Sequence, residues 1–189
     1  MIEASGARQL PDVLRLVPGM QTGYSDANSA VVTYHGLSEE FSRRLQVLVD
    51  GRSVYIPSFG GVPWLDLPLA LEDIERIEVI RGPNSATYGS NAFLGVISIT
   101  TRHSAEDAGH YMKANRGNDD IGDAVYRFGG SAGSVNYRLT ARYQQDEGFD
   151  RTEDEAGQLW DNNDWYRARV FTGRADYQAS NTDHWEFQA

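Results

Sequence analysis

Residues 74–102, IERIEVIRGPNSATYGSNAFLGVISITTR, decide the fold of this chain. Over 74–81, charged and apolar side chains alternate with a period close to two, which is typical of a half-buried strand rather than an amphipathic helix. We therefore expect the charges of this strand to share a face: Glu75, Arg76, Glu78 and Arg81. A Gly-Pro turn and a Tyr-Gly-Ser bend follow, and residues 95–100 form a second apolar strand rich in β-branched residues. The stretch predicts a small sheet that folds inside a larger structure.

The composition fits a folded protein and limits its class. With 189 residues, 40% of them hydrophobic, the chain can bury the core of one large or two small domains. The absence of Cys excludes disulfide scaffolds and cysteine-based sites and leaves the compartment open. The sequence contains no apolar run of about 18 residues and so predicts no membrane-spanning helix, and residues 1–4 carry no signal-peptide pattern.

Charge and aromatic content are distributed unevenly. The net charge of −10 argues against nucleic acid as a partner, because phosphate binding needs an electropositive surface. Residues 104–189 hold 16 of the 27 acidic residues and 13 of the 21 aromatic residues. The second part of the chain is therefore both acidic and aromatic.

Residues 1–103 mix helix and strand signals. We expect a helix over 4–16 that ends at Pro18-Gly19, then a loop over 20–32 and a short strand at 31–35. Residues 45–55, LQVLVDGRSVY, predict a hairpin whose tight turn is Asp50-Gly51. An exposed loop follows over 56–67, and Pro68 starts a short helix through Asp73.

From Gly109 onward the pattern is that of an antiparallel meander. Apolar and polar residues alternate around 124–128, 137–144 and 166–170, and we expect a bulge at Gly173-Arg174, where the parity fails. The connections at 118–121, 132–134 and 179–182 are short, whereas 146–164 is long and acidic. Strands of about ten residues with this arrangement match an outer-membrane barrel. The alternation also fits a soluble sandwich, and both stay open on these residues alone.

Four ordered motifs carry a family resemblance: LPDVLRLVPGM (10–20), YHGL (34–37), VLVDGRSV (47–54) and the 74–101 stretch. Together they resemble the plug domain of TonB-dependent outer-membrane receptors, and 109–189 is similar to the first strands of their barrel. The resemblance implies an α+β plug domain (1–103), a small mixed sheet with short helices. An antiparallel β-meander (104–189), the start of a transmembrane β-barrel, follows it.

The resemblance also implies function and location. In this family a barrel of about 22 strands in the Gram-negative outer membrane holds the plug in its lumen, with the N-terminus periplasmic. A scarce ligand such as a siderophore, haem, cobalamin or another metal chelate is imported, driven by the TonB complex, and outer-membrane lipid surrounds the barrel. From the resemblance we expect a TonB box that is not part of these 189 residues.

A plug needs its own apolar core and a charged shell toward the barrel lumen. We expect the core from Leu14, Val47, Val49, Ile77, Val79, Val96 and Ile97. Expected plug–barrel contacts are His35, Glu75, Glu78 and Arg81, with Arg127, Arg138, Arg142, Arg167 and Arg169 as their counterparts on the wall. A polar interface of this kind can be remodelled at modest cost. In the family, two Arg residues are thought to lock the plug to the barrel. His35 stands at one of these two positions, and Arg81 keeps the other.

By the same resemblance, ligand meets two outward-facing plug loops, 21–30 and 56–66. Hydrogen-bonding groups are expected from Tyr24, Ser25, Asp26 and Asn28, and aromatic faces from Tyr55, Phe59 and Trp64. A turn-closing role for the polar residues and a core role for Trp64 stay open.

Enzymatic and metal chemistry find little support in the sequence. The four histidines, His35, His103, His110 and His184, lack metal-ligand spacing, and no Ser occupies a nucleophile elbow. Residues 81–90 lack the Lys of a phosphate loop, and the acidic 146–164 stretch lacks the order of a calcium loop. We expect neither catalysis nor a cofactor. A non-transport binding or signalling receptor, or a soluble α+β binding module, stays open beside the import receptor.

Overall fold

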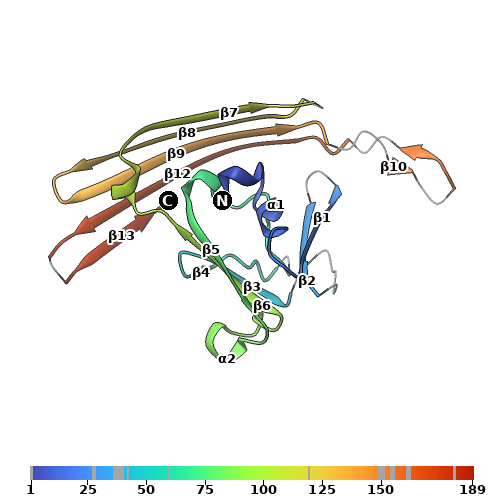
Figure 1. The fold of residues 1–189 in the computed structure, drawn as a ribbon, viewed down its shortest axis with the longest axis horizontal. Helices are drawn as coiled ribbons and strands as arrows, with labels where there is room; N and C mark the ends of the chain where they lie inside the picture. The colour runs from blue at the N-terminus through green and yellow to red at the C-terminus, as the bar shows by residue number, and fades with distance from the viewer. Residues whose placement is uncertain are drawn as a thin grey trace. The chain divides into compact units, whose positions relative to one another are not determined.

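The computed structural model describes residues 2–26, 29–35, 41, 43–58, 60–118, 120–148, 152–153, 156–160, 163–180 and 182–189. The chain forms two compact units. Unit 1 comprises Met1–Leu67 and Leu71–Thr101, and unit 2 comprises Pro68–Ala70 and Arg102–Ala189. Figure 1 follows the elements of both units in chain order.

Unit 1 is built on a four-stranded mixed sheet. Its strand order is β4-β3-β6-β5, from β3 (Leu45–Val49), β4 (Arg52–Ser53), β5 (Ile74–Arg81) and β6 (Gly95–Thr101). The antiparallel pair β5–β6 confirms the two strands predicted from the 74–102 stretch, and the short helix α2 (Ser85–Tyr88) lies between them. β3 runs parallel to β6, a pairing between segments about fifty residues apart that local patterns do not specify.

The hairpin at Asp50-Gly51 is confirmed, with φ of 48° and 76° at the two turn residues. Asp50 also has a second role. Its two carboxylate oxygens accept hydrogen bonds of 2.8 Å from the backbone N–H and the hydroxyl of Thr101. The turn is therefore tied to the last residue of β6.

Three local predictions for unit 1 were wrong. Residues 20–32 do not form a loop: β1 (Met20–Asp26) and β2 (Ser29–Tyr34) pair as an antiparallel hairpin, because buried side chains such as Met20 and Val32 outweigh the turn-forming residues between them. The expected 4–16 helix is reduced to η1 (Glu3–Ser5) and the short α1 (Leu10–Leu14). The helix expected from Pro68 is the 3₁₀ turn η2 (Leu71–Asp73).

The charges of β5 do not all share a face. Arg76 and Glu78 lie two residues apart and form a salt bridge of 3.5 Å, whereas Arg81 is three residues from Glu78 and falls on the opposite face. Glu75 sits at a register irregularity between Ile74 and Arg76. Strict alternation fails here because an irregularity shifts the side chains that precede it.

The apolar core of unit 1 includes most of the expected residues. Leu14, Val47, Val96 and Ile97 are fully buried, while Val49, Ile77 and Val79 are half-buried. Among the residues that the structure describes, no helix is long and apolar enough to cross a membrane.

Unit 2 is a five-stranded antiparallel meander of order β13-β12-β9-β8-β7. Its strands are β7 (Gly109–Arg116), β8 (Gly122–Ala132), β9 (Val135–Asp146), β12 (Tyr166–Gln178) and β13 (His184–Gln188). The predicted meander is confirmed, but the predicted bulge at Gly173-Arg174 is wrong, since β12 pairs with β9 without interruption from Tyr166↔Asp146 to Tyr177↔Val135. The long connection also contains two short strands, β10 (Thr152–Glu153) and β11 (Leu159–Trp160), that sequence did not predict.

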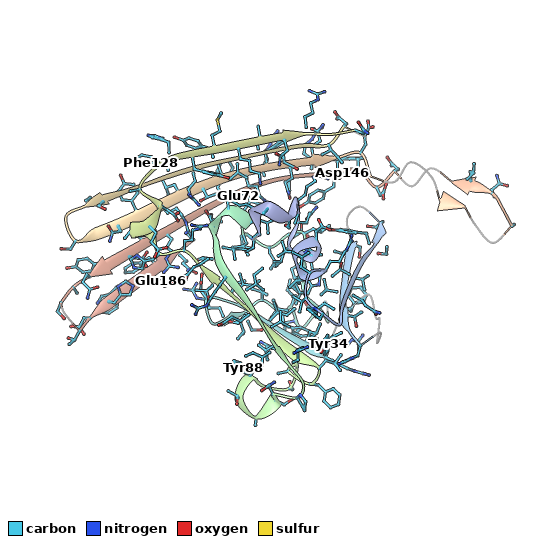
Figure 2. The ribbon with its side chains drawn as sticks, in the orientation of Figure 1. Tyr34, Glu72, Tyr88, Phe128, Asp146 and Glu186 are labelled. Atoms are coloured by element: carbon cyan, nitrogen blue, oxygen red, sulfur yellow. The ribbon has the colours of Figure 1, made fainter. Side chains whose placement is uncertain are left out.

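The cross-strand register shows that the two faces of this sheet, whose side chains are drawn in Figure 2, differ in chemistry. The cross-strand register places a series of exposed apolar side chains on one face: Met112, Tyr126, Leu139, Phe171, Tyr177, Trp185 and Phe187. The other face carries Arg127, Arg138 and Arg142, as predicted for the wall. The same prediction is wrong for Arg167 and Arg169, which share the face of Tyr143 because they lie at odd positions of β12.

Candidate functional site

The first predicted ligand loop is the end of the β1–β2 hairpin. Tyr24 is half-buried, and its hydroxyl donates a 2.9 Å hydrogen bond to Oδ1 of Asp12 in α1. Burial raises the pKa of Tyr24, and the Asp12 carboxylate raises it further, so the hydroxyl stays protonated at ordinary pH. Ser25 is exposed and Asp26 pairs with Ser29, whereas Asn28 lies outside the described residues. Tyr24 is therefore a structural link between α1 and the hairpin.

The second predicted loop is closed by its own backbone. Ile56 and Gly61 form an isolated bridge, and the N–H of Gly60 donates to the carbonyl of Ile56 at 2.8 Å. Tyr55 is half-buried, and Phe59 lies outside the described residues. Trp64 is only 7% exposed and belongs to the core of unit 1. Its ring does not offer the exposed stacking face that the sequence suggested, because the neighbouring Val62, Leu65 and Leu67 are also buried and make this an apolar segment.

The four plug residues expected to contact the barrel wall have solvent-exposed side chains. His35 follows β2 with a φ of 61°, and its ring meets that of Tyr34 edge-on at 3.9 Å between centroids. Glu75 and Glu78 flank Arg76 in two loose ion pairs of 3.8 and 3.5 Å. Exposed pairs of this kind add little stability, so these carboxylates keep their capacity to bind another cation.

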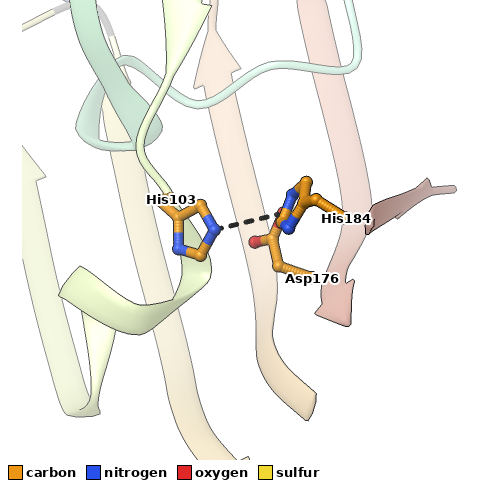
Figure 3. Close-up of side chains that lie close together, drawn as sticks. All are labelled: His103, Asp176 and His184. Atoms are coloured by element: carbon orange, nitrogen blue, oxygen red, sulfur yellow. Dashed lines mark ion pairs between the residues drawn. The ribbon is translucent and has the colours of Figure 1, made fainter. Parts of the chain in front are cut away.

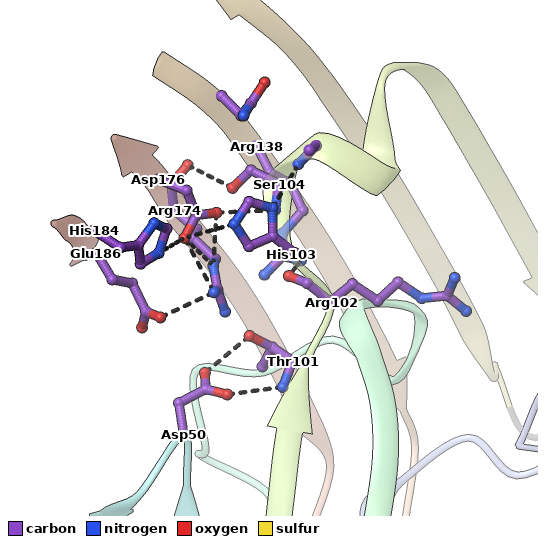
Figure 4. Close-up of polar contacts among 12 residues, drawn as sticks. Asp50, Thr101, Arg102, His103, Ser104, Arg138, Arg174, Asp176, His184 and Glu186 are labelled. Carbon is purple, nitrogen blue, oxygen red and sulfur yellow. Dashed lines mark hydrogen bonds and ion pairs between the residues drawn. The ribbon is translucent and has the colours of Figure 1, made fainter. Parts of the chain in front are cut away.

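Unit 2 contains a buried polar cluster that sequence analysis did not predict (Figure 4). It surrounds η3 (Ser104–Asp107), the 3₁₀ turn that precedes β7. At one end of η3, Asp176 accepts hydrogen bonds from the Ser104 N–H at 2.9 Å and from the Arg174 Nε at 3.0 Å. Arg174 also donates to Glu186 at 2.9 Å. One face of β12 and β13 is thus joined to η3 by charge-assisted bonds.

A second charged group holds the other end of η3. Asp107 is 5% exposed and forms ion pairs with Arg138 at 3.0 Å and Arg127 at 3.1 Å. Arg138 also donates to the carbonyl of Arg102 at 2.8 Å. η3 approaches β8 so closely that a Cβ at Gly129 would collide with the Asp107 carbonyl oxygen. The sequence predicted Arg127 and Arg138 as wall residues but did not predict Asp107 as their partner, because Asp107 lies 20 or more residues away from both along the chain.

The exposed apolar face of unit 2 contains an open groove of about 430 Å³. Its walls include His110, Tyr126, Phe128 and Phe171. The Nδ1 of His110 lies 2.8 Å from the hydroxyl of Tyr126, so the most polar groups of the groove satisfy each other. The remaining surface is apolar and suits hydrocarbon rather than a polar ligand.

A small mixed sheet followed by a meander with one apolar and one charged face defines a plug and the beginning of a barrel wall. The family model of the TonB-dependent receptor plug domain matches residues 1–96. The chain belongs to the TonB-dependent receptor family, whose members are transporters rather than enzymes.

Sequence relatives agree with this assignment. The chain is 34% identical over 161 residues to the vitamin B12 transporter BtuB of Vibrio vulnificus strain CMCP6, covering 82% of this chain and 25% of that protein. It is 35% identical over 133 residues to the vitamin B12 transporter BtuB of Photobacterium profundum, covering 69% of this chain and 20% of that protein. The chain therefore spans about a quarter or less of the length of these relatives.

Solved structures show the same fold at lower identity. The FrpB iron transporter of Neisseria meningitidis matches with a TM-score of 0.75 and 12% identity, over 96% of this chain and 29% of that chain. The ferric yersiniabactin uptake receptor FyuA of Yersinia pestis matches with a TM-score of 0.68 and 20% identity, over 99% of this chain and 29% of that chain. These likenesses establish the architecture and leave the ligand to other evidence.

Proposed function

We propose that this chain is the plug and first barrel strands of a receptor that imports a scarce ligand across the Gram-negative outer membrane. The observation that carries the proposal is the two-faced meander of unit 2 directly after a plug that matches the family model. An apolar outer face suits lipid, and a charged inner face suits a lumen filled by a polar plug. The domain boundary is placed at 103/104, with the N-terminus on the periplasmic side.

The plug gates the lumen, and TonB supplies the energy for its movement. Exposed charges on the plug support this part of the proposal, because ion pairs at a hydrated surface contribute little each and can be exchanged. His35, Glu75, Glu78 and Arg81 are the plug residues that would meet the wall. Arg127, Arg138 and Arg142 lie on the face of the meander that would form the lumen wall, where Arg127 and Arg138 also pair with Asp107.

Ligand contact is assigned to the two plug loops at 21–30 and 56–66. Ser25, Asp26 and Tyr55 are the described residues best suited to it, together with Asn28 and Phe59. Tyr24 and Trp64 act behind them, as supports of the loops, since one is bonded to Asp12 and the other is buried. A corrinoid is the first ligand to test, because the sequence relatives named above are vitamin B12 transporters.

The test is uptake by the complete gene product in a Gram-negative host that lacks its own vitamin B12 receptor. We expect labelled cyanocobalamin to accumulate only when the receptor and a functional tonB gene are both present. A ferric siderophore panel under iron limitation follows if cobalamin is not taken up. Absence of uptake for every ligand, with receptor present at the surface, contradicts the transport function.

The loop assignment has its own test. Asp26→Ala and Tyr55→Ala should each weaken ligand binding by about tenfold, because a lost hydrogen bond or stacking face at a ligand contributes about 1–2 kcal/mol. Glu3→Ala, which removes an exposed carboxylate of the same unit outside both loops, serves as the matched control. Unchanged binding by both variants would remove these loops from the site.

A further inference from the structure

Three side chains with metal-binding atoms meet at one end of unit 2, although they are far apart in the sequence (Figure 3). His103 precedes η3, Asp176 lies near the end of β12, and His184 begins β13. The ligand atoms of these three residues lie within 4.8 Å of one another. The spacing of the histidines along the sequence lacks a metal pattern, and the meander brings two of them together.

We propose that His103, Asp176 and His184 form a binding site for a divalent transition-metal ion of the zinc class. Two imidazole nitrogens and one carboxylate oxygen form a ligand set that suits Zn²⁺, Cu²⁺ and Ni²⁺ better than it suits Mg²⁺ or Ca²⁺. Three protein ligands leave a coordination position for water. The site goes beyond ligand import and does not depend on which ligand the receptor carries.

The two histidine–carboxylate distances are close to those around a tetrahedral ion. The Nε2 atoms of His103 and His184 lie 3.7 and 3.5 Å from Oδ1 of Asp176. Bonds of about 2.0–2.1 Å to a tetrahedral zinc ion place its ligand atoms about 3.3 Å apart. The two nitrogen–oxygen distances exceed this separation by only a few tenths of an ångström, and the ligand atoms of all three residues lie within 4.8 Å of one another.

Neighbouring groups already hold the carboxylate in place. Oδ2 of Asp176 accepts from the Ser104 N–H at 2.9 Å and from the Arg174 Nε at 3.0 Å. Oδ1, which also meets the Arg174 guanidinium at 3.1 Å, is the oxygen that faces both histidines. Outer contacts of this kind fix the orientation of a ligating carboxylate.

Simple ion pairing explains the cluster less well. Charging both histidines would place two imidazolium rings 5.5 Å apart, next to the guanidinium of Arg174 and against a single buried carboxylate. A catalytic triad is also unsuitable, because Ser104 is 1% exposed and its hydroxyl lies against the Arg174 carbonyl oxygen at 3.4 Å. A divalent ion carries the same total charge, but it can bond directly to both ring nitrogens and to the carboxylate oxygen, whereas the rings lie 3.5–3.7 Å from that oxygen.

Metal binding requires one rearrangement at His103. Its Nδ1 accepts a 3.2 Å hydrogen bond from the Ala105 N–H, which places the proton of the neutral ring on Nε2. Coordination through Nε2 moves that proton to Nδ1 and releases the Ala105 N–H. This bond is exposed to solvent, so water replaces it readily.

The test uses the complete gene product in detergent, purified with a tag that contains no histidine and stripped with a chelator. Calorimetric titration with ZnCl₂ should show one more binding equivalent in the wild type than in the double variant His103→Ala/His184→Ala. Each single variant should weaken that site by at least tenfold. His110→Ala is the matched control, because this histidine lies in the same sheet but is paired with Tyr126, and its titration should equal that of the wild type.

Cobalt gives an independent readout. The wild-type spectrum minus that of the double variant should contain the visible absorption of four-coordinate Co²⁺. Equal zinc stoichiometry and affinities within twofold for wild type and double variant overturn the proposal, as does an equal loss in His110→Ala. If the double variant does not fold, His184→Ala alone decides the question, since that side chain is 40% exposed and its removal leaves the core intact. Ligand uptake is not measured, so failure of the import function leaves this result unaffected.

Discussion

At the scale of single residues, several side chains have roles that their local sequence does not reveal. The tight turn at Asp50-Gly51 was predicted from the turn propensity of these two residues, and the turn is present. Its bonds to Thr101, 51 residues away, depend on β3 pairing in parallel with β6. Tyr24 and Trp64 were predicted as ligand contacts because the family resemblance makes their loops outward-facing and their side chains can hydrogen-bond or stack. Their bonding and burial follow from packing partners that the sequence does not specify.

Replacing Asp50 by Asn should lower the free energy of unfolding by about 1 kcal/mol. The Asn side chain retains the left-handed turn but offers only one acceptor oxygen to the two donors of Thr101. Urea unfolding of the complete gene product, followed by fluorescence, measures the change. Asp66→Asn, at an exposed site in the same unit, should leave the midpoint within experimental error. Equal midpoints for both variants would show that the Thr101 contacts are dispensable.

The raised pKa of Tyr24 predicts a stability effect at high pH. Below the unfolded-state value near 10.0 the hydroxyl is protonated in both states, so its contribution to stability is fully present. Above that pH the unfolded state releases this proton and the folded state does not, so stability falls as pH rises. Thermal unfolding between pH 8 and 11 should therefore decline more steeply for wild type than for Tyr24→Phe, and parallel curves would contradict the buried phenol.

At the scale of elements, prediction succeeded where a pattern is local. Alternation over 124–128 and 137–144 specified the meander, and Asp50-Gly51 specified a hairpin. It failed for β1 and β2, whose polar residues read as a loop, and for the unbroken register of β12. Along one face of β12, apolar residues such as Ala168 and Val170 give way to the ion pair of Arg174 and Asp176. In the sequence, this switch from apolar to charged residues resembles the shift in alternation that a bulge would cause.

The close approach of η3 to β8 makes Gly129 sensitive to substitution. Gly129→Ala should destabilise unit 2 by about 1–3 kcal/mol, because the new methyl group would collide with the Asp107 carbonyl oxygen rather than with a flexible side chain. Comparing heat-induced unfolding of purified receptor measures the effect. Gly133→Ala is an unsuitable control because its φ is 62°, whereas Gly122→Ala meets only one atom at 4.0 Å and should be tolerated.

At the scale of the molecule, the register of unit 2 aligns its apolar residues in rows across the strands. Met112, Tyr126, Ala141 and Phe171 form one row, and the next row along the sheet is Ala114, Ala124, Tyr143 and Arg169. The charge of Arg169 therefore marks one edge of the apolar band. In the proposed barrel this edge lies at the boundary between hydrocarbon and headgroups.

Charged substitutions should report depth within this band. Leu139→Arg lies about 13 Å along β9 from the Tyr143 row and should cost about 2–4 kcal/mol of folding free energy in a bilayer. Ala124→Arg, in the row of Arg169, should cost about 0–1 kcal/mol. Folding yields into lipid vesicles compare the two, and similar yields would contradict a lipid-facing apolar band.

The two-residue turn between β8 and β9 restricts how the length of this protein can vary. Ala132 pairs with Val135 across Gly133, whose φ is 62°. If one residue were inserted there and the turn kept its length, the register of β9 would shift by one residue. Thr140 would then point to the face on which Leu139 now lies, and every other side chain of β9 would also change face. A single insertion or deletion in this hairpin therefore keeps the outward face of β9 only if the turn itself absorbs the change. The connection between β9 and β12 is much longer than this two-residue turn, so an epitope or a fluorescent reporter inserted there need not change the side-chain parity of either strand.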